Sequence, residues 1–172
     1  ILRPGCVIPG ANDSKKLAPE TRERLYDLVR AEALSYGVAL VKPVVIDRIN
    51  ILEASRLAMR RALARLMPAP DVVLVDGWEL PHFHRVPGLA GARQEAFPKA
   101  DGLSQSVACA SILAKVTRDR LMVRLHRRYP HYDFAGNKGY PTPAHLRALE
   151  AHGPCAIHRR SFSPVAQLRL AL

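Results

Sequence analysis

An apolar run typical of a strand lies at residues 71–77, Asp-Val-Val-Leu-Val-Asp-Gly. Four consecutive apolar residues, three of them β-branched, predict a strand buried on both faces, because a strand with one wet face would alternate polar and apolar positions. The run ends on Asp76, and open α/β sheets bind their ligands just outside the carboxyl ends of the strands. Asp76 is therefore a candidate functional residue, although a solvated aspartate that begins a turn is the simpler interpretation.

Helical periodicity accounts for much of the remaining chain. Apolar residues three and four apart predict helices over residues 19–33, 47–67, 104–129 and 142–152. Two further segments, residues 37–45 and 95–101, predict strands, and Pro98 makes the second of them an edge strand. Because no internal repeat, low-complexity tract or clear linker interrupts this pattern, residues 1–172 are expected to form one domain.

The charge balance is unusual for a chain with 48% hydrophobic residues. It holds 26 Lys and Arg against 15 Asp and Glu, a net charge of +11, which favours a polyanionic partner such as nucleic acid. No apolar run approaches the ~18 residues of a membrane span, and no signal peptide is visible. Cys6, Cys109 and Cys155 are scattered and match neither a disulfide framework nor a zinc spacing, which favours reduced thiols in the cytoplasm.

Two carboxylates, Asp76 and Asp101, end predicted strands. Carboxylate oxygens are the ligands preferred by Mg²⁺ and Mn²⁺. Neighbouring strands would bring the two side chains together, in an arrangement suited to two ions about 3.5–4 Å apart acting on one phosphodiester. A strand that ends in Asp also fits a nucleotide triphosphatase, but the phosphate-binding motif that this reading requires, G-x-x-x-x-G-K-[ST], is absent from the sequence.

Histidines and aromatic residues give weaker signals. His82 and His84 form an H-x-H pair without a third ligand at metal spacing. Trp78 follows the central strand and is interpreted as a packing residue, with stacking on a base as the alternative. Tyr140 differs, because it lies in a loop beside Lys138, where a core role is hard to justify and stacking on a sugar or base is favoured.

Seven stretches make the sequence resemble the ribonuclease HII family, the type 2 ribonucleases H. They follow one another in the family's order and cover nearly the whole chain. They are Asn-Asp-Ser-Lys-Lys-Leu at 12–17, Ile-Asn-Ile-Leu-Glu-Ala at 49–54, Leu-Val-Asp-Gly at 74–77, Lys-Ala-Asp at 99–101, Ala-Ser-Ile-Leu-Ala-Lys-Val-Thr-Arg-Asp at 110–119, Asn-Lys-Gly-Tyr-Pro-Thr at 137–142 and Ile-His-Arg-Arg-Ser-Phe at 157–162.

The resemblance implies an α/β fold, with an RNase H-like mixed β-sheet flanked by helices and a helical C-terminal extension. It implies a monomeric endoribonuclease that uses Mg²⁺ or Mn²⁺ to cleave RNA paired with DNA and to incise beside single ribonucleotides in duplex DNA. Asp76 and Asp101 would be two of four metal-binding carboxylates, and Tyr140 would pack on the sugar at the RNA–DNA junction. The motifs that carry Lys15, Lys16, Asn50 and Lys138 resemble substrate-contacting ones.

Two departures from the family pattern stand out. The family opens with a strand ending in Asp-Glu and a Gly-Arg-Gly turn, and neither occurs in this sequence, which begins at Ile1 as a fragment would. The loop between Asp76 and Asp101 is also longer than expected. Without its first central strand the sheet would leave buried backbone groups unpaired, at roughly 1–3 kcal/mol each. The 172 residues alone are therefore expected to be unstable or inactive, and a longer parent protein to be an active nuclease.

Two alternatives belong to other functional classes. A basic nucleic-acid-binding protein without chemistry would keep the positive surface and lack the metal site. A basic ribosome-associated protein would carry Asp76 and Asp101 as ordinary turn residues. An Asp-Glu pair upstream of Ile1 would favour the enzyme over the first alternative, and binding of divalent cations would argue against the second.

Overall fold

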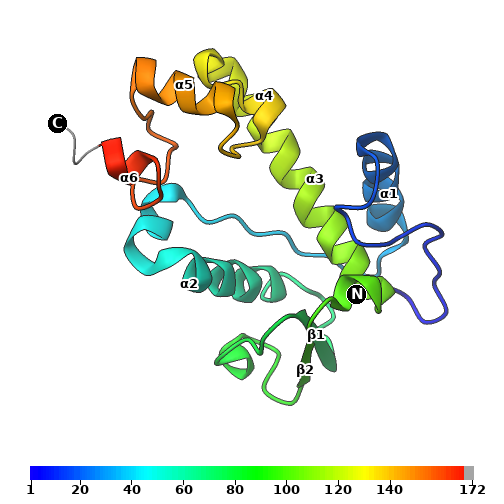
Figure 1. The fold of residues 1–172 in the computed structure, drawn as a ribbon. Helices are drawn as coiled ribbons and strands as arrows, with labels where there is room; N and C mark the ends of the chain where they lie inside the picture. Colours follow the sequence, from blue (N-terminus) through cyan, green and yellow to red (C-terminus); the bar gives the residue numbers. More distant parts are fainter. Residues whose placement is uncertain (169–172) are drawn as a thin grey trace. The chain divides into compact units, whose positions relative to one another are not determined.

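The computed structural model describes residues 1–168 of the chain. Its elements follow the chain in the order α1 (Pro19–Glu32), α2 (Pro43–Leu63), β1 (Val72–Asp76), η1 (Phe83–Arg85), β2 (Arg93–Phe97), η2 (Ala100–Gly102), α3 (Gln105–Arg128), η3 (Pro130–Tyr132), α4 (Phe134–Asn137), α5 (Pro143–His152) and α6 (Val165–Leu168), where η denotes a 3-10 helix (Figure 1). No helix in this range is long and apolar enough to cross a membrane.

The chain divides into two compact units. Unit 1 contains Ile1–Leu40 and Arg56–Val116, and unit 2 contains Val41–Ser55 and the residues from Thr117 onward. The expectation of a single domain over residues 1–172 stays a prediction.

Helix α1 and the first half of α3 supply the main core of unit 1. Pro19 occupies the first turn of α1, where its missing N–H costs nothing, and the periodic residues Leu25 and Val29 are fully buried. They pack with Ile8 and with Ile112 of α3. The predicted helices over 19–33 and 104–129 are therefore confirmed, with bounds that differ by one residue at most.

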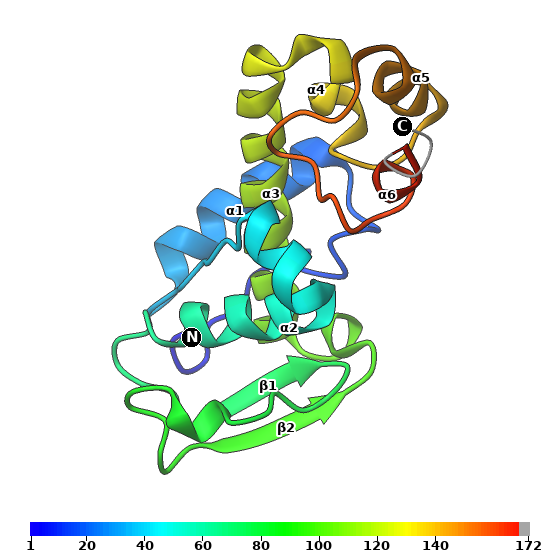
Figure 2. The same ribbon diagram turned by 90° about the vertical axis from the view of Figure 1, so that its left-hand side faces the viewer.

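The sheet of unit 1 consists of two parallel strands in the described residues. Strand β1 pairs with β2 from Val72 opposite Arg93 to Asp76 opposite Phe97, and Figure 2 shows the two arrows side by side and pointing the same way. Val73 and Val75 of β1 are buried in a second core with the loop that follows. The α/β class is confirmed. The mixed sheet is smaller than implied: besides this pair, the described residues contain only an isolated antiparallel bridge between Leu2 and Ala33.

The strand predicted over residues 37–45 is wrong. Residues 37–42 have no regular structure, and α2 begins at Pro43. A strand needs a partner with which to share its backbone hydrogen bonds. Here the carbonyl of Val38 accepts a hydrogen bond from the Arg65 guanidinium instead. Gly37 lies against the Ala62 carbonyl so closely that a side chain would not fit.

Two other predicted boundaries need correction. Strand β2 ends at Phe97, before Pro98, so Asp101 does not end a strand but lies in η2. The helix predicted over 47–67 runs from Pro43 to Leu63 and is broken at Asn50, whose φ of 63° is left-handed. The Asn50 side chain accepts a hydrogen bond from the Glu53 N–H at 3.1 Å, and so caps the second segment of α2.

Unit 2 is helical around an aromatic core. Tyr132 and Phe134 stack with their ring centroids 5.4 Å apart, and they are buried with Met122, Leu149 and Val165. Thr142 caps α5 by accepting a hydrogen bond from the His145 N–H, which confirms the helix predicted over 142–152. Helices α5 and α6 form the helical C-terminal part that the resemblance implies (Figure 1).

Candidate metal and nucleic-acid site

The two predicted metal-binding aspartates lie at the same end of the β1–β2 pair. Asp76 is the last residue of β1 and is exposed. Its Oδ1 accepts a hydrogen bond from the backbone N–H of Ala100 at 3.0 Å, and Asp101 is the next residue in η2. Lys99, in a left-handed conformation with φ of 61°, turns the chain from β2 into η2. The structure therefore brings Asp76 and Asp101 together, although by a turn and not by two strand ends.

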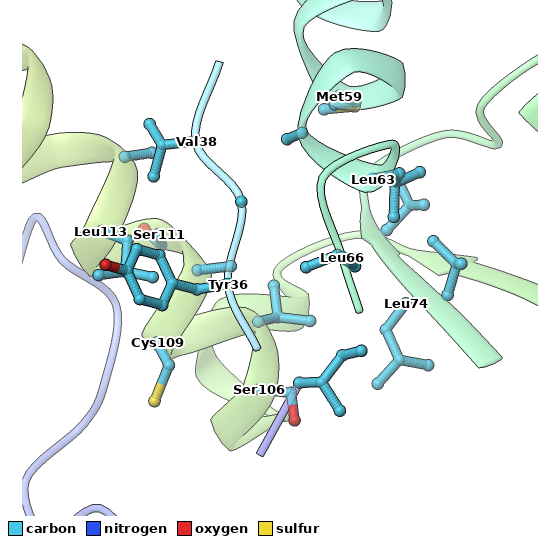
Figure 3. Close-up of a pocket in the computed structure, with 18 of the residues that line it drawn as sticks. Tyr36, Val38, Met59, Leu63, Leu66, Leu74, Ser106, Cys109, Ser111 and Leu113 are labelled. Atoms are coloured by element: carbon cyan, nitrogen blue, oxygen red, sulfur yellow. The ribbon is translucent and has the colours of Figure 1, made fainter. Parts of the chain in front are cut away.

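An apolar cavity of about 470 Å³ lies in unit 1 beside β1, and both aspartates belong to its lining. Figure 3 shows Leu63 and Leu74 on one side of it and Val38 and Leu113 on the other. Cys109 also lines this cavity, and burial, together with nearby Cys6, raises the pKa of its thiol to about 11. The free edge of β1 is the one opposite β2, since no other strand of the described residues pairs with it.

Lys15 and Lys16 lie in a turn of unit 1 and are both exposed. The Asp13 carboxylate accepts a hydrogen bond from the Lys15 N–H at 2.9 Å, and the Ser14 hydroxyl is hydrogen-bonded to that of Ser111 in α3 at 2.7 Å. Because Ser14 is buried and the two lysines are not, the turn is anchored to α3 while both ammonium groups face solvent. That arrangement suits contacts to a phosphate backbone.

Tyr140 and Lys138 lie in the loop between α4 and α5 of unit 2. The Tyr140 side chain is 59% exposed, while its backbone N–H donates to the Asn137 carbonyl at 2.8 Å. The Lys138 ammonium donates to the Ala135 carbonyl, and the Lys138 carbonyl accepts from Arg118 at 3.1 Å. Gly139 has a φ of 83° and lies against the end of Arg118, so this loop is tightly built.

Asp47 is a residue of unit 2 that sequence reasoning missed. Its carboxylate accepts hydrogen bonds from the backbone N–H groups of Arg160 and Ser161, both at 2.9 Å, and from the Ser161 hydroxyl at 2.7 Å. These bonds lower the pKa of Asp47 against the opposing effect of desolvation, which is its largest single influence. Asp47 thereby ties the start of α2, which carries Asn50, to residues 160–161.

Arg159 and Arg118 form a second feature that was missed. The Arg159 guanidinium lies 3.7 Å above the Phe162 ring. Burial, and then repulsion from Arg118, lowers the pKa of Arg159. Two arginines close enough to repel one another would gain from a phosphate placed near both. The only signal in the sequence is that both residues fall in stretches that resemble the family.

The remaining sequence candidates do not form a metal site. In the part of the chain that the structure describes, no group of three or more His, Cys, Asp and Glu side chains is placed to hold a metal ion, so His82 and His84 have no third ligand. Trp78, interpreted as a packing residue, is 81% exposed, and that interpretation is wrong. Among the predicted site residues, unit 1 holds Asp76, Asp101, Lys15 and Lys16, whereas unit 2 holds Asn50, Lys138 and Tyr140.

Comparison with known proteins decides the family. The model of the ribonuclease HII family matches residues 9–165, which include every predicted site residue. The chain belongs to the ribonuclease HII family. It is 52% identical over 161 residues to the ribonuclease HII of Delftia acidovorans, and 49% identical over 167 residues to that of Shewanella amazonensis. These alignments cover 94% and 97% of this chain, but 66% of the Delftia protein and 78% of the Shewanella protein.

Solved ribonuclease HII structures share the fold. The structure of ribonuclease H2 from Pyrococcus horikoshii matches with a TM-score of 0.77 and 30% identity, over 94% of this chain and 81% of that one. The ribonuclease HII of Archaeoglobus fulgidus, solved in a complex with PCNA, matches with a TM-score of 0.70 and 26% identity, over 93% of this chain and 80% of that one. The resemblance drawn from the sequence motifs is confirmed.

Proposed function

We propose that the chain carries most of a metal-dependent endoribonuclease, which hydrolyses the RNA strand of RNA–DNA hybrids and incises beside ribonucleotides embedded in duplex DNA. One observation carries this proposal: the Asp76 carboxylate is hydrogen-bonded to the residue before Asp101, within a family match over residues 9–165. The net charge of +11 supports a nucleic-acid substrate. The working form would be a cytoplasmic monomer.

Asp76 and Asp101 would hold Mg²⁺ or Mn²⁺. Their chemistry fits, because both supply the hard carboxylate oxygens that these ions prefer, and the exposed Asp76 leaves room for water and phosphate oxygens. Bound there, a pair of ions would activate water and stabilise the leaving oxygen. The protein would fix the positions of the carboxylates, and the hydrogen bond from the Ala100 N–H fixes that of Asp76.

Two carboxylates are few for such a site, and we propose that the 172 residues alone are inactive. The relatives extend beyond the aligned part of this chain, and the free edge of β1 adjoins an apolar cavity. A further strand in a longer form of the protein would pair with that edge, fill the cavity and add ligands next to Asp76. The other predicted residues, Lys15, Lys16, Asn50, Lys138 and Tyr140, would bind the nucleic acid.

A second candidate function is a nucleic-acid-binding protein without catalysis. It is favoured by the lack of any three-residue metal-binding group among residues 1–168. The two candidates differ in what they require of Asp76, since only the nuclease needs its charge.

The metal proposal can be tested by Mn²⁺ binding to the 172-residue chain, measured by electron paramagnetic resonance. Asp76→Asn removes the charge but keeps an oxygen that can accept the Ala100 N–H, so it should weaken binding about tenfold or more without loss of fold. Asp71→Asn, which changes the exposed residue directly before β1, is the matched control and should have no effect. Equal losses from both substitutions, or none from Asp76→Asn, would contradict the assignment.

A further inference from the structure

A chain of hydrogen bonds in unit 2 links Cys155 to Tyr140 through two histidines. The His145 Nδ1 lies 2.9 Å from the Tyr140 carbonyl oxygen, and the His145 Nε2 lies 3.1 Å from the His158 Nε2. The His158 Nδ1 lies 3.0 Å from the Cys155 backbone nitrogen and 3.1 Å from the Cys155 Sγ. None of these contacts involves a residue of the metal site.

The groups at the two ends of this series of hydrogen bonds fix the protonation of both histidine rings. The Tyr140 carbonyl can only accept, so the His145 Nδ1 must carry a proton, and in a neutral ring its Nε2 is then an acceptor. The His158 Nε2 must therefore donate, which leaves the His158 Nδ1 as an acceptor. At the other end the Cys155 N–H can only donate, and this requires the same acceptor. Both ends agree on a single arrangement of two neutral rings.

The surroundings of the pair favour the neutral state. His145 is 5% exposed, and the Tyr132 ring lies edge-on to both histidines, with centroids 4.8 Å from His158 and 6.3 Å from His145. The Phe134 ring lies 5.5 Å from each. The Tyr132 ring packs on both histidines while its hydroxyl donates to the Gly153 carbonyl, and the Cys155 thiol contacts His158. Burial raises the pKa of Tyr132 and of Cys155. Burial, and then repulsion from His145, lowers the pKa of His158 to about 4.

The chain of bonds ends on the backbone of Tyr140 and not on its ring. The Tyr140 carbonyl accepts from both the His145 ring and the Thr142 N–H, the latter at 2.9 Å, and the Tyr140 N–H donates to Asn137. The backbone is thus held on both sides, while the side chain is 59% exposed. A fixed backbone beneath an exposed aromatic ring reduces the entropy that is lost when the ring contacts a ligand.

We infer that His145 and His158 form a neutral relay that positions Tyr140, so that its ring is preorganised to pack on the sugar at a ribonucleotide junction. The contact between Tyr140 and the junction rests on the proposed function. The hydrogen-bonded pair of histidines does not depend on it. His145 is a positioning residue, because it acts through the Tyr140 backbone and has no contact with substrate in this account.

Two substitutions at His145 separate the effects of its two hydrogen bonds. In His145→Asn the amide nitrogen replaces Nδ1, so the hydrogen bond to the Tyr140 carbonyl is kept and the one to His158 is lost. In His145→Gln the amide group replaces Nε2 and can still contact His158, whereas the donor to Tyr140 is lost. The readout is the ratio of affinities for a DNA duplex with one ribonucleotide and for the same duplex without it. His145→Gln should reduce this ratio about tenfold, His145→Asn much less.

Two controls separate positioning from a general loss of structure. His152→Asn changes an exposed histidine on the same helix α5 and should leave the ratio unchanged. In a Tyr140→Ala background, His145→Gln should cause no further loss, because the positioned ring is gone. Equal effects of His145→Gln and His152→Asn, or an undiminished effect of His145→Gln without the Tyr140 ring, would overturn the inference.

A spectroscopic measurement tests the relay independently of any substrate. Imidazole ¹⁵N spectra of the 172-residue chain at pH 7 should show the Nδ1–H tautomer for His145 and the Nε2–H tautomer for His158. A charged ring, or the opposite tautomer at His145, would refute the relay. If the tautomers are as expected but the wild-type chain does not distinguish the two duplexes, the relay stands and the junction role of Tyr140 fails.

Discussion

Among single residues, backbone hydrogen bonds do most of the positioning in both units. Asp76 is held by the Ala100 N–H, Lys15 follows an Asp13 turn, and the Tyr140 carbonyl is held by His145 and Thr142. Sequence motifs pointed to Asp76, Lys15 and Tyr140 as candidates. They could not identify the residues that hold them, because Ala100, His145 and Asp47 act through contacts that depend on tertiary structure.

The low pKa of His158 makes stability depend on pH. Above a pH of about 6.5, His158 is neutral in both the folded and the unfolded chain. As the pH falls from there towards about 4, His158 takes up a proton in the unfolded state but not in the folded state. The free energy of unfolding should therefore fall over this range, with the loss complete below about 4. Urea unfolding followed by circular dichroism measures it.

His158→Asn provides the comparison for this effect. It keeps an acceptor for the Cys155 N–H but has no group that titrates, so the decline between pH 6.5 and about 4 should be smaller than in the wild-type chain. Carboxylates titrate in both proteins and cancel in the difference. Identical pH dependence would show that His158 titrates normally.

Helices were easier to predict than strands in this chain, and the reason is physical. A helix satisfies its backbone from within, so the periodicity of residues 19–33 and 104–129 was sufficient. A strand depends on a neighbour, and the apolar run at residues 37–45 has none among the described strands. Strand β1 formed because β2 lies beside it, and even so one of its edges lacks a strand partner in the described sheet.

The free edge of β1 gives a prediction for hydrogen exchange. The Gly77 N–H donates to the Phe97 carbonyl of β2. Along a strand, the backbone groups of every second residue face the same neighbour. The Val75 N–H therefore faces β2, and the Leu74 N–H faces the opposite edge. In the 172-residue chain the Leu74 amide should exchange at least about tenfold faster than that of Val75. In a longer form with a strand at that edge, both should be protected. Equal protection in the short chain would contradict the free edge.

For the molecule as a whole, the family and the cavity lead to the same conclusion. The chain matches the ribonuclease HII family over residues 9–165, yet spans 66% of the length of its Delftia relative. Its two candidate metal ligands adjoin an apolar cavity of about 470 Å³ beside β1. A segment that filled this cavity would give its apolar lining packing contacts that the lining now lacks. We therefore propose that a segment that fills this cavity and adds ligands beside Asp76 completes the site.

The most direct test is cleavage of a DNA duplex carrying one ribonucleotide, with Mg²⁺ or Mn²⁺, by the 172-residue chain and by a form extended upstream. We predict incision by the extended form, its abolition by Asp76→Asn, and no incision by the 172 residues alone. Cleavage by the 172 residues alone would contradict the claim that the site is incomplete. Duplex binding without cleavage by either form would contradict the nuclease and favour the non-catalytic binding protein.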